Sequence, residues 1–400
     1  MKLHCDIQLP ASKSESNRAL MIAAYGRFAP DFQNLSDSND TLLLYKLLES
    51  MPCGVIDVSD CGTAARFLTT YLACHEGDSL LTGTERMKQR PIKPLVDALL
   101  ELGADIQYVG KEGFLPLRIK GRPLAGGKVP IDMTRSSQFV SSLLLAAPFF
   151  PFGLELELLG GLNSLPYLEM TLAMMRHFGA EAVRSERTIT VNPKPYQSRR
   201  FIISPDWTAA SYWYEMAAFS DECEIKLRSL SLSEGLNLQG DAVVSEWMAQ
   251  LGVGTFDAND GIVLRKIPFE KRRLSFDFSQ HPDLYPTMVA TCVGLNVEAS
   301  FAGLDNLAAK ESDRVETMQM ELAKLGKQPL RFCAHNDHRV VMALAPLAIL
   351  YGPVAFDHPE VVGKSYPRFW EDVSFLPKSP NLSAYWFFLL SLHDFFTLSS

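Results

Sequence analysis

Four segments of the sequence place small polar residues and a cation directly before an apolar helical pattern. In the first, Leu9–Leu20 (LPASKSESNRAL), Lys13 and Ser14 precede the apolar run, and Arg18 lies one turn further along the same face. Unpaired N–H groups at a helix start, with hydroxyl groups and a cation beside them, bind phosphate or carboxylate well. Ordinary helix capping with solvated charges explains this one segment equally well.

The other three segments repeat this arrangement. They are DCGTAAR at Asp60–Arg66, MKQRP at Met87–Pro91 and RSSQ at Arg135–Gln138. In the first of them, Gly62 allows the backbone to approach a ligand closely. Capping explains each segment singly, but four such helix starts in one chain favour a site that collects small anions.

Carboxylates stand beside cations in the second half of the chain, in KESDR at Lys310–Arg314 and NDHR at Asn336–Arg339. The run HNDH at His335–His338 has the residue types of a metal site. It lacks the spacing of known zinc motifs, so we expect no metal. The run VGKS at Val362–Ser365 is similar to the end of a P-loop, but the first Gly of that motif would fall at His358. We therefore reject the P-loop interpretation.

Composition sets the frame in which these residues must be positioned. The chain has 400 residues, 47% hydrophobic and 21% charged, which predicts a globular protein of two domains. Its net charge of −8 argues against a general nucleic-acid binder, because such proteins are normally basic. A local cluster of Arg and Lys that binds small anions remains compatible with that charge.

Cysteine usage and hydropathy favour a cytoplasmic protein. The seven cysteines are scattered and form no CxxC pair, so we interpret them as reduced thiols. Residues Met1–Pro10 have no apolar signal segment, and the apolar stretch Tyr385–Leu392 is too short to span a bilayer. We expect no contact with nucleic acid or membrane.

An internal repeat predicts how the helices are arranged. Four amphipathic helices end in glycine, and these glycines are 76, 73 and 74 residues apart. Glycine at such a position is the signal for a left-handed helix cap. The four segments are Leu95–Gly103, Met170–Gly179, Val244–Gly252 and Met318–Gly326.

Three of these glycines lead into a predicted β-hairpin, whereas Gly326 does not. Further helices are predicted between the repeats, so each unit mixes parallel and antiparallel strands in an α/β fold. Pro123–Pro130 (PLAGGKVP) is predicted to be a loop. The predicted hairpins pair Ala104–Val109 with Pro116–Ile119, Ala180–Val183 with Thr188–Val191, and Val253–Phe256 with Gly261–Arg265. The additional helices are Ser137–Ala147, Trp207–Ala218 and Pro286–Leu295.

Eight motifs occur in one order from Leu9 to about Asp372: PASKSESNRAL, DCGTAARFL, LTGTERMKQRPIKPLVDAL, SSQFVSSLLLAAP, SLPYLEMTLAMMRHFG, KESDR, NDHR and GKSYP. Together they resemble the enolpyruvyl transferase family, and within it the 5-enolpyruvylshikimate-3-phosphate synthases. The patterns SKSxSNRA and LTGxxRMKxRP are highly specific signatures of that group.

The resemblance implies an α/β fold of two domains, each built from repeated βαβαββ units as an inside-out α/β barrel, with the ligand cleft between them. It implies a first domain of residues 1–12 and 206–374 and an inserted second domain of residues 13–205. Residues 375–400 do not match, and we interpret them as an accessory tail. Only 21 residues separate Arg314 from Asn336, so the last unit is expected to be shortened.

The same resemblance implies an activity. The enolpyruvyl group of phosphoenolpyruvate would be transferred to the 5-hydroxyl of shikimate 3-phosphate, with release of phosphate and without a cofactor or metal. We expect a monomer whose partners are these small molecules. Asp283 would take the proton of the attacking hydroxyl, and Glu311 would protonate the methylene carbon and later remove a proton. Lys13 would share in the proton transfer.

Binding residues follow from the matched motifs. The shikimate 3-phosphate site would use Lys13, Ser14, Arg18, Ser136, Ser137, Gln138, Ser164, Tyr167, Asp283, Asn306 and Lys310. The phosphoenolpyruvate site would use Lys13, Gly62, Arg90, Gln138, Arg314, Arg339 and Lys364.

Two alternatives remain open. A UDP-N-acetylglucosamine enolpyruvyl transferase shares the fold, but it usually has a reactive Cys where this chain has Thr84–Gln89. A catalytically impaired relative that only binds anionic ligands is the other alternative, motivated by the short segment after Lys324. Two further departures from the family pattern are Leu165, in place of a basic residue, and Arg135 before SSQ.

Overall fold

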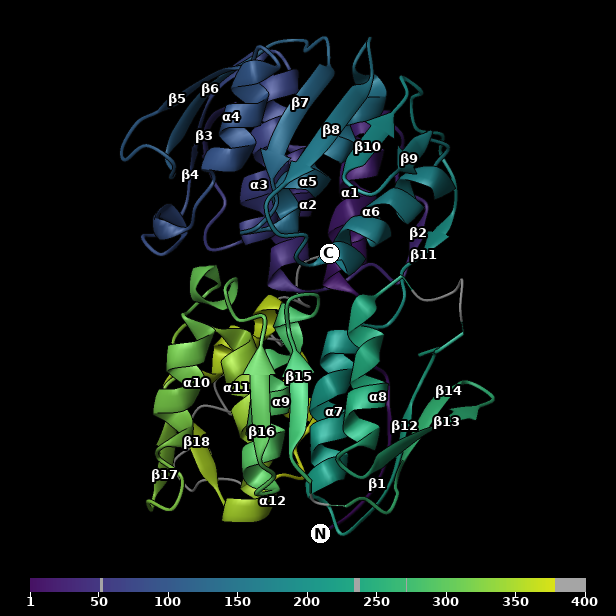
Figure 1. The fold of residues 1–400 in the computed structure, drawn as a ribbon, viewed down its shortest axis with the longest axis vertical. Coiled ribbons are helices and arrows are strands. Elements are labelled where there is room, and N and C mark those ends of the chain that lie inside the picture. Colours follow the sequence, from purple (N-terminus) through teal and green to yellow (C-terminus); the bar gives the residue numbers. More distant parts are fainter. Residues whose placement is uncertain (51–52, 234–237, 271, 378–400) are drawn as a thin grey trace, which may run out of the picture.

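The chain forms two lobes, one above the other along the longest axis of the molecule (Figure 1). The computed structural model describes residues 1–50, 53–233, 238–270 and 272–377. Each lobe has its own hydrophobic core, and we call residues 11–203 the upper lobe and residues 1–9 with 207–376 the lower lobe. The predicted tail 375–400 lies outside the described residues from position 378 onward.

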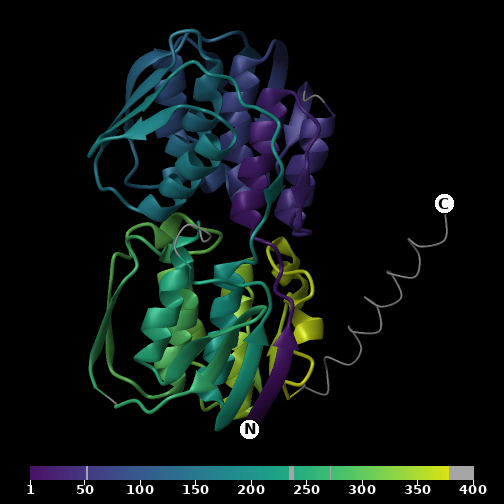
Figure 2. The same ribbon diagram turned by 90° about the vertical axis from the view of Figure 1, so that its right-hand side faces the viewer.

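The chain passes between the lobes twice, and the two passages lie side by side (Figure 2). Ala11 and Pro205 form an antiparallel bridge, and the backbone N–H of Ser12 donates to the carbonyl of Ser204 at 2.8 Å. The upper lobe is therefore an insertion whose two ends meet at one place.

Three four-stranded sheets repeat one topology. In each, two parallel strands are followed by an antiparallel hairpin, in the orders β3-β4-β6-β5, β7-β8-β10-β9 and β1-β12-β14-β13. One helix joins the parallel strands of the first two sheets, whereas the upper lobe and α7 lie between β1 and β12. The strands are β1 (Lys2–Ile7), β3 (Gly54–Asp57), β4 (Gly77–Thr82), β5 (Asp105–Tyr108), β6 (Leu117–Gly121), β7 (Gly127–Asp132), β8 (Leu154–Leu159), β9 (Ala182–Arg184), β10 (Thr188–Val191), β12 (Glu222–Leu227), β13 (Val253–Ala258) and β14 (Gly261–Lys266).

Three further units contribute only a parallel pair of strands: β2 with β11, β15 with β16, and β17 with β18. Among the described residues no hairpin follows α10 (Arg314–Leu322), which confirms the predicted shortening there. The sequence did not indicate that the other two units are equally short. These strands are β2 (Phe32–Gln33), β11 (Phe201–Ile202), β15 (Leu274–Asp277), β16 (Ala299–Ala302), β17 (Leu330–Phe332) and β18 (Val354–Phe356).

Helices fill the middle of each lobe, and the sheets lie outside them. In the upper lobe α1, α3 and α5 pack on one another, and in the lower lobe α7, α9 and α11 do the same. All residues of α7 are buried, as expected for a helix surrounded by other elements. The helices are α1 (Lys13–Gly26), α2 (Asn39–Glu49), α3 (Gly62–Cys74), α4 (Lys93–Glu101), α5 (Ser137–Ala146), α6 (Leu165–His177), α7 (Trp207–Phe219), α8 (Val244–Ala249), α9 (Tyr285–Gly294), α11 (His338–Leu344), α12 (Ala348–Tyr351) and α13 (Phe369–Asp372).

The glycine repeat is confirmed as a set of left-handed helix ends. Gly103, Gly179, Gly252 and Gly326 have φ values of 91°, 93°, 86° and 86°. Residues with a Cβ rarely adopt this conformation, which explains why glycine recurs at that point of each unit. The three predicted hairpins also form.

One local prediction was wrong. The segment Pro123–Pro130 is not a loop throughout, because Pro130 lies inside β7. β7 is an edge strand, paired only with β8, so a residue without an N–H group is tolerated there.

Candidate active site

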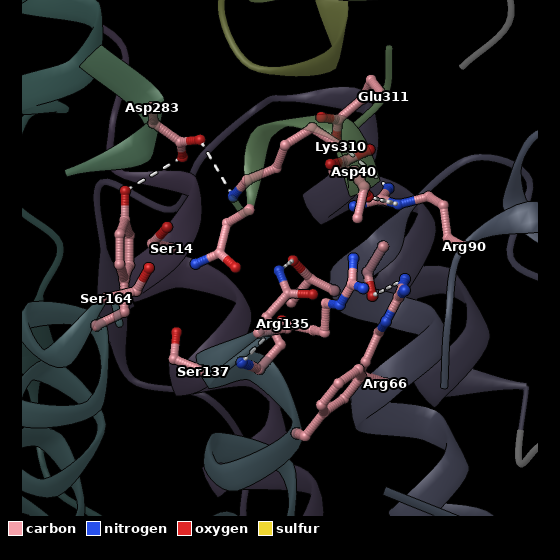
Figure 3. A pocket seen from close by; sticks show the side chains of 18 of the residues that line it. Ser14, Asp40, Arg66, Arg90, Arg135, Ser137, Ser164, Asp283, Lys310 and Glu311 are labelled. Carbon is pink, nitrogen blue, oxygen red and sulfur yellow. Dashed lines mark hydrogen bonds and ion pairs between the residues drawn. The ribbon is translucent and has the colours of Figure 1, made fainter. Parts of the chain in front are cut away.

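A cleft lies between the lobes and is lined by side chains from both (Figure 3). Its lining includes every residue predicted from the sequence except Lys364. Those residues are Lys13, Ser14, Arg18, Gly62, Arg90, Ser136, Ser137, Gln138, Ser164, Tyr167, Asp283, Asn306, Lys310, Glu311, Arg314 and Arg339. Other lining residues include Asp40, Thr63, Arg66, Arg135 and His338.

Helix starts from both lobes converge on this cleft. In the upper lobe α1, α3 and α5 begin at Lys13, Gly62 and Ser137, and in the lower lobe α10 and α11 begin at Arg314 and His338. All five residues line the cleft. Three of the four predicted helix starts are therefore confirmed at the cleft, whereas the helix after MKQRP, α4, begins at Lys93, which does not line it. The backbone dipoles of the converging helices add a positive potential that favours bound anions.

The cleft reverses the charge balance of the chain. Its lining holds eight Lys and Arg side chains but three carboxylates, whereas the whole chain has a net charge of −8. Field lines concentrate in such a cleft and raise the local concentration of anions. The arrangement fits ligands with several negative charges.

Arg18 is fixed in the wall of the upper lobe. Its Nε donates to Thr171 Oγ1 at 2.7 Å, Nη1 to the carbonyl of Ser14 at 2.9 Å and Nη2 to the carbonyl of Tyr167 at 3.2 Å. Burial lowers the pKa of Arg18 to about 10, so the side chain is still a cation at neutral pH. These neutral partners leave its positive charge uncompensated and available to an anion.

Asp283 is the most strongly paired carboxylate of the lower lobe. Its Oδ1 accepts from Arg314 Nη1 at 2.8 Å, and its Oδ2 accepts from Arg339 Nη2 at 2.8 Å and from the hydroxyl of Tyr167 at 3.2 Å. Lys310 Nζ lies 3.6 Å from Oδ1. Burial opposes ionisation, but Arg339, Lys310 and Arg314 outweigh it and hold the pKa of Asp283 well below its ordinary value. The group is a carboxylate at neutral pH.

Glu311 shares Arg314 with Asp283 and also pairs with Arg90. Its Oε2 accepts from Arg314 Nη2 at 2.9 Å, and its Oε1 lies 3.5 Å from Arg90 Nη1. Burial opposes ionisation, but Arg90 and Arg314 foremost hold the pKa of Glu311 well below its ordinary value. Arg314 therefore contacts both predicted catalytic carboxylates at once.

Asp337 fixes Arg314 from behind. It is fully buried and accepts from Arg314 Nε at 2.8 Å, from the hydroxyl of Ser312 at 3.1 Å and from the backbone N–H of Arg339 at 3.0 Å. One carboxylate thus caps α11 and orients the guanidinium that faces the cleft.

Asp40 holds two lysines together at the edge of the cleft. Its Oδ2 accepts from Lys13 Nζ at 2.9 Å, and its Oδ1 lies 3.1 Å from Lys364 Nζ. Burial opposes ionisation, but Lys13 and Lys364 hold the pKa of Asp40 below its ordinary value. Lys364 also contacts Asp60 at 2.8 Å, so it lies beside the cleft lining rather than in it.

Gly62 leaves room for the guanidinium of Arg90. A Cβ atom at position 62 would lie 2.8 Å from Nη1 and 2.9 Å from Nη2 of that arginine. Arg90 Nη1 is buried, makes no hydrogen bond within the protein and lies 3.5 Å from Glu311 Oε1. The predicted close approach at Gly62 is thus to a side chain of the same site.

His338 and His335 belong to different surroundings, although they are three residues apart. His338 lines the cleft, is buried, and neither ring nitrogen has a hydrogen-bond partner. Burial, with Lys13 and Arg339 nearby, holds the pKa of His338 well below its ordinary value, so its ring is neutral. Both nitrogens can therefore serve a ligand or water.

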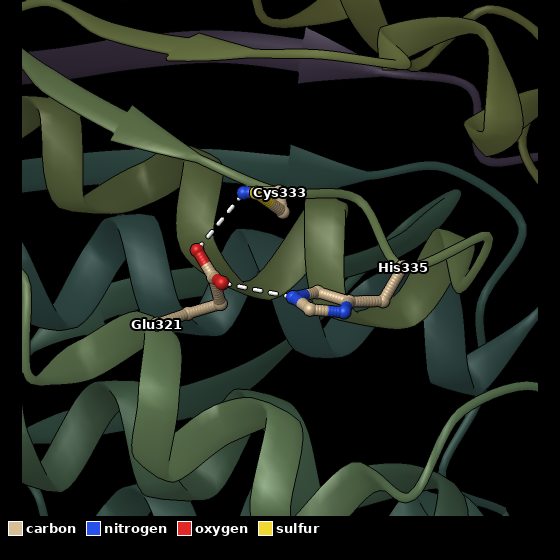
Figure 4. A group of neighbouring side chains, drawn as sticks. All are labelled: Glu321, Cys333 and His335. Atoms are coloured by element: carbon tan, nitrogen blue, oxygen red, sulfur yellow. Dashed lines mark hydrogen bonds and ion pairs between the residues drawn. The ribbon is translucent and has the colours of Figure 1, made fainter.

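His335 instead joins Glu321 and Cys333 outside the cleft, within 4.8 Å of one another (Figure 4). Glu321 accepts from His335 at 2.8 Å, from the backbone N–H of Cys333 at 2.9 Å and from Lys324 at 2.6 Å. The ammonium of Lys324 lies beside the Glu321 carboxylate, in the position that a bound metal cation would take. The group ties α10 to the turn that precedes α11.

The sequence did not indicate several residues that hold the predicted site residues in position. Asp40 and Asp337 sit at helix starts that the sequence marks, after Ser38 and inside NDHR, but nothing local indicates which lysine or arginine each one holds. Arg66 and His338 lie in matched motifs and were read only as parts of them.

Comparison with known proteins places this geometry in a family. The sequence pattern of the family described as EPSP synthase (3-phosphoshikimate 1-carboxyvinyltransferase) matches residues 50–373. A 3-phosphoshikimate 1-carboxyvinyltransferase of Bacteroides fragilis is 44% identical in an alignment of 393 positions that covers 93% of this chain and 95% of that protein. One from Histophilus somni is 32% identical over 425 residues, covering 94% and 96%.

The fold has a counterpart among solved structures. An EPSP synthase from Acinetobacter baumannii superimposes with a TM-score of 0.71 at 18% identity, over 94% of this chain and 96% of that chain. Fold and cleft define a two-lobed α/β protein of repeated units with a cleft rich in Lys and Arg between the lobes. The chain belongs to the EPSP synthase (3-phosphoshikimate 1-carboxyvinyltransferase) family. Within the described residues, no helix combines the length and the apolar character needed to cross a membrane.

Proposed function

We propose that this chain transfers the enolpyruvyl group of phosphoenolpyruvate to the 5-hydroxyl of shikimate 3-phosphate and releases phosphate. The observation that carries this proposal is the cleft itself, where the carboxylates of Asp283 and Glu311 face a ring of Arg and Lys and share Arg314. Family membership supports the same reaction. The reaction needs acid–base groups and anion binding, both of which this chain provides without a cofactor or metal.

The upper lobe would hold shikimate 3-phosphate. Its phosphate fits the starts of α1 and α5, where Ser14 and Ser137 adjoin backbone N–H groups, and Arg18 and Lys13 supply positive charge. Asp283 would contact the 5-hydroxyl from the lower lobe. As a carboxylate, it can accept the proton when that oxygen bonds to the substituted carbon of phosphoenolpyruvate.

The arginines that bridge the lobes would hold phosphoenolpyruvate. Arg90, Arg314 and Arg339 match its phosphate and carboxylate, and Lys364 would reinforce them through its position beside Asp40. Arg90 lines the cleft, and its Nη1 makes no hydrogen bond within the protein, so it is the first contact we assign to this ligand.

Glu311 must carry a proton before it can protonate the methylene carbon. Arg90 and Arg314 keep its pKa low in this structure, but a bound phosphate dianion would neutralise those cations. Binding of phosphoenolpyruvate would therefore raise the pKa of Glu311 and load it with the proton that the carbon needs. Glu311 would recover that proton when phosphate leaves the tetrahedral intermediate and the double bond re-forms.

We further propose that the two lobes are the domains 1–12 with 206–374 and 13–205. Separate cores and the paired passages at Ala11 and Pro205 support this division. We also propose a monomer, because one chain supplies the whole cleft, acting in the cytoplasm, where its free thiols stay reduced. Light scattering after size exclusion tests the monomer.

Phosphate release tests the function. We expect release only when phosphoenolpyruvate and shikimate 3-phosphate are both present, and a loss of about a hundredfold or more in Glu311→Ala. The exposed Glu298 provides a matched control, and Glu298→Ala should keep full activity. Release only with UDP-N-acetylglucosamine would favour the sister enzyme, and ligand binding without release would favour the impaired relative.

A further inference from the structure

Four consecutive backbone carbonyls of the lower lobe accept hydrogen bonds from two arginines of the upper lobe. Arg86 Nε donates to the carbonyl of Glu311 at 2.9 Å, and Arg86 Nη2 donates to the carbonyls of Lys310 at 2.9 Å and Ala308 at 3.4 Å. Arg90 Nε donates to the carbonyl of Ala309 at 3.3 Å. The segment that carries Lys310 and Glu311 is thus held along its backbone from across the cleft.

The upper-lobe side of this contact is a firm support. The loop that carries Arg86 is tied down because Thr84 N–H donates to the carbonyl of Ser59 at 2.9 Å and Met87 is buried. Gly83 packs so closely that a Cβ there would lie 2.5 Å from the carbonyl of Ser59. The side chain of Arg86 therefore reaches out from a fixed base, and its partners are available only when the lobes are together.

We propose that Arg86 is a positioning residue that links closure of the lobes to the placement of Lys310 and Glu311. This inference rests on the proposed function, since it assigns Glu311 a role in the reaction. Arg86 itself does not line the cleft, so it acts through the backbone of these residues and not on the substrates. Arg90 also lines the cleft and pairs with Glu311, which makes Arg86 the member of the pair that is dedicated to closure.

The chemistry of the contact calls for arginine. A guanidinium offers Nε and Nη2 in a fixed fork, and here the fork spans the carbonyls of Glu311 and Lys310. Lysine offers a single ammonium at the end of a flexible stem, which can serve one of these carbonyls at a time. Hydrogen bonds from a charged donor are also stronger than those between neutral groups.

The test compares Arg86→Ala and Arg86→Lys with Arg118→Ala, a matched control in the same lobe. Arg118 pairs with Asp78 on the exposed outer sheet, away from the cleft. We expect kcat to fall about tenfold to a hundredfold in Arg86→Ala, from the loss of two short charge-assisted hydrogen bonds, with partial recovery in Arg86→Lys. Arg118→Ala should match wild type both in kcat and in the dissociation constant of shikimate 3-phosphate.

Small-angle X-ray scattering supplies a readout that a purely local role would not move. Both substrates should reduce the radius of gyration of the wild type, and Arg86→Ala should show a smaller reduction at saturating substrate. Unchanged kcat and full compaction in Arg86→Ala would overturn the inference while leaving the proposed function intact. If the wild type is inactive, the proposed function is wrong. The change in radius of gyration would then test only whether Arg86 contributes to closure of the lobes.

Discussion

Arg314 and Asp337 form a buried pair in which the carboxylate orients the guanidinium from behind, with Nε 2.8 Å from Oδ2 and Nη2 3.4 Å from Oδ1. Both side chains are almost completely buried. Because the same guanidinium reaches Asp283 and Glu311, a residue outside the cleft sets the geometry inside it.

Breaking this pair should cost both stability and activity. We expect Asp337→Ala to lower the free energy of unfolding by about 3–5 kcal/mol, because it leaves a buried guanidinium with one fewer partner. Urea unfolding followed by circular dichroism measures this, with Asp337→Asn expected to lose less. A loss below about 1 kcal/mol in the alanine variant would show that Arg314 is held well enough by its other carboxylates.

Replacing Asp40 should lower activity, although Asp40 has no assigned contact with either substrate. In Asp40→Asn the ammonium groups of Lys13 and Lys364 lose their common carboxylate, and each is free to adopt another position. We expect kcat/KM to fall about tenfold to a hundredfold, since small displacements of positioning groups have effects of that size. Steady-state phosphate release measures it, and wild-type kinetics in a folded Asp40→Asn protein would refute the assignment.

Adding a methyl group at Gly62 should disturb Arg90. The new Cβ would lie within 3.0 Å of three guanidinium atoms, so the arginine must move. We expect Gly62→Ala to raise KM for phosphoenolpyruvate about tenfold or more, with a smaller effect on shikimate 3-phosphate. Gly110→Ala is the control, because its Cβ would meet only Pro116 at 3.7 Å. If the KM of each ligand is the same in Gly62→Ala as in the wild type, the proposed contact between Arg90 and phosphoenolpyruvate is wrong.

Glu215 should make the lower lobe less stable as the pH rises. It is fully buried in α7, neither carboxyl oxygen has a hydrogen-bond partner, and burial raises its pKa well above the ordinary value. The unfolded chain loses this proton near pH 4.3 while the folded chain keeps it. The contribution of Glu215 to stability is therefore largest below that pH and declines as the pH rises above it.

Replacing Glu215 by an apolar side chain of similar length removes this dependence. We expect Glu215→Met to raise the free energy of unfolding at pH 7 by about 1–3 kcal/mol and to differ little from wild type near pH 4. Thermal and urea unfolding at both pH values measure the difference, with the exposed Glu298→Met as control. A destabilised Glu215→Met at pH 7 would mean that the carboxyl group has a structural partner such as water.

The parts of the fold that sequence predicted well are those with local causes. Gly103 and its three counterparts mark helix ends because only a positive φ fits there, and the hairpin after each of the first three follows from strand patterns within a few residues. Pro130 shows the limit of such reasoning. A proline argues against a strand, but the edge position of β7, which depends on the whole sheet, makes it acceptable.

The candidate site divides in the same way. Helix starts rich in Ser, Gly and Arg can be recognised from neighbouring residues, and they do converge on one cleft. The partnerships of Asp40 with Lys364 and of Arg86 with Glu311 join residues more than two hundred positions apart. They arise only when the two lobes meet, so no local pattern announces them.

The bridge between Ala11 and Pro205 also limits how the molecule can move. Two independent tethers at opposite edges would stretch when the lobes separate, and a single tether would let one lobe tumble freely. Two tethers side by side act as a single hinge between the lobes. Separation of the lobes is then a rotation about one line, and each group in the cleft travels in proportion to its distance from that line.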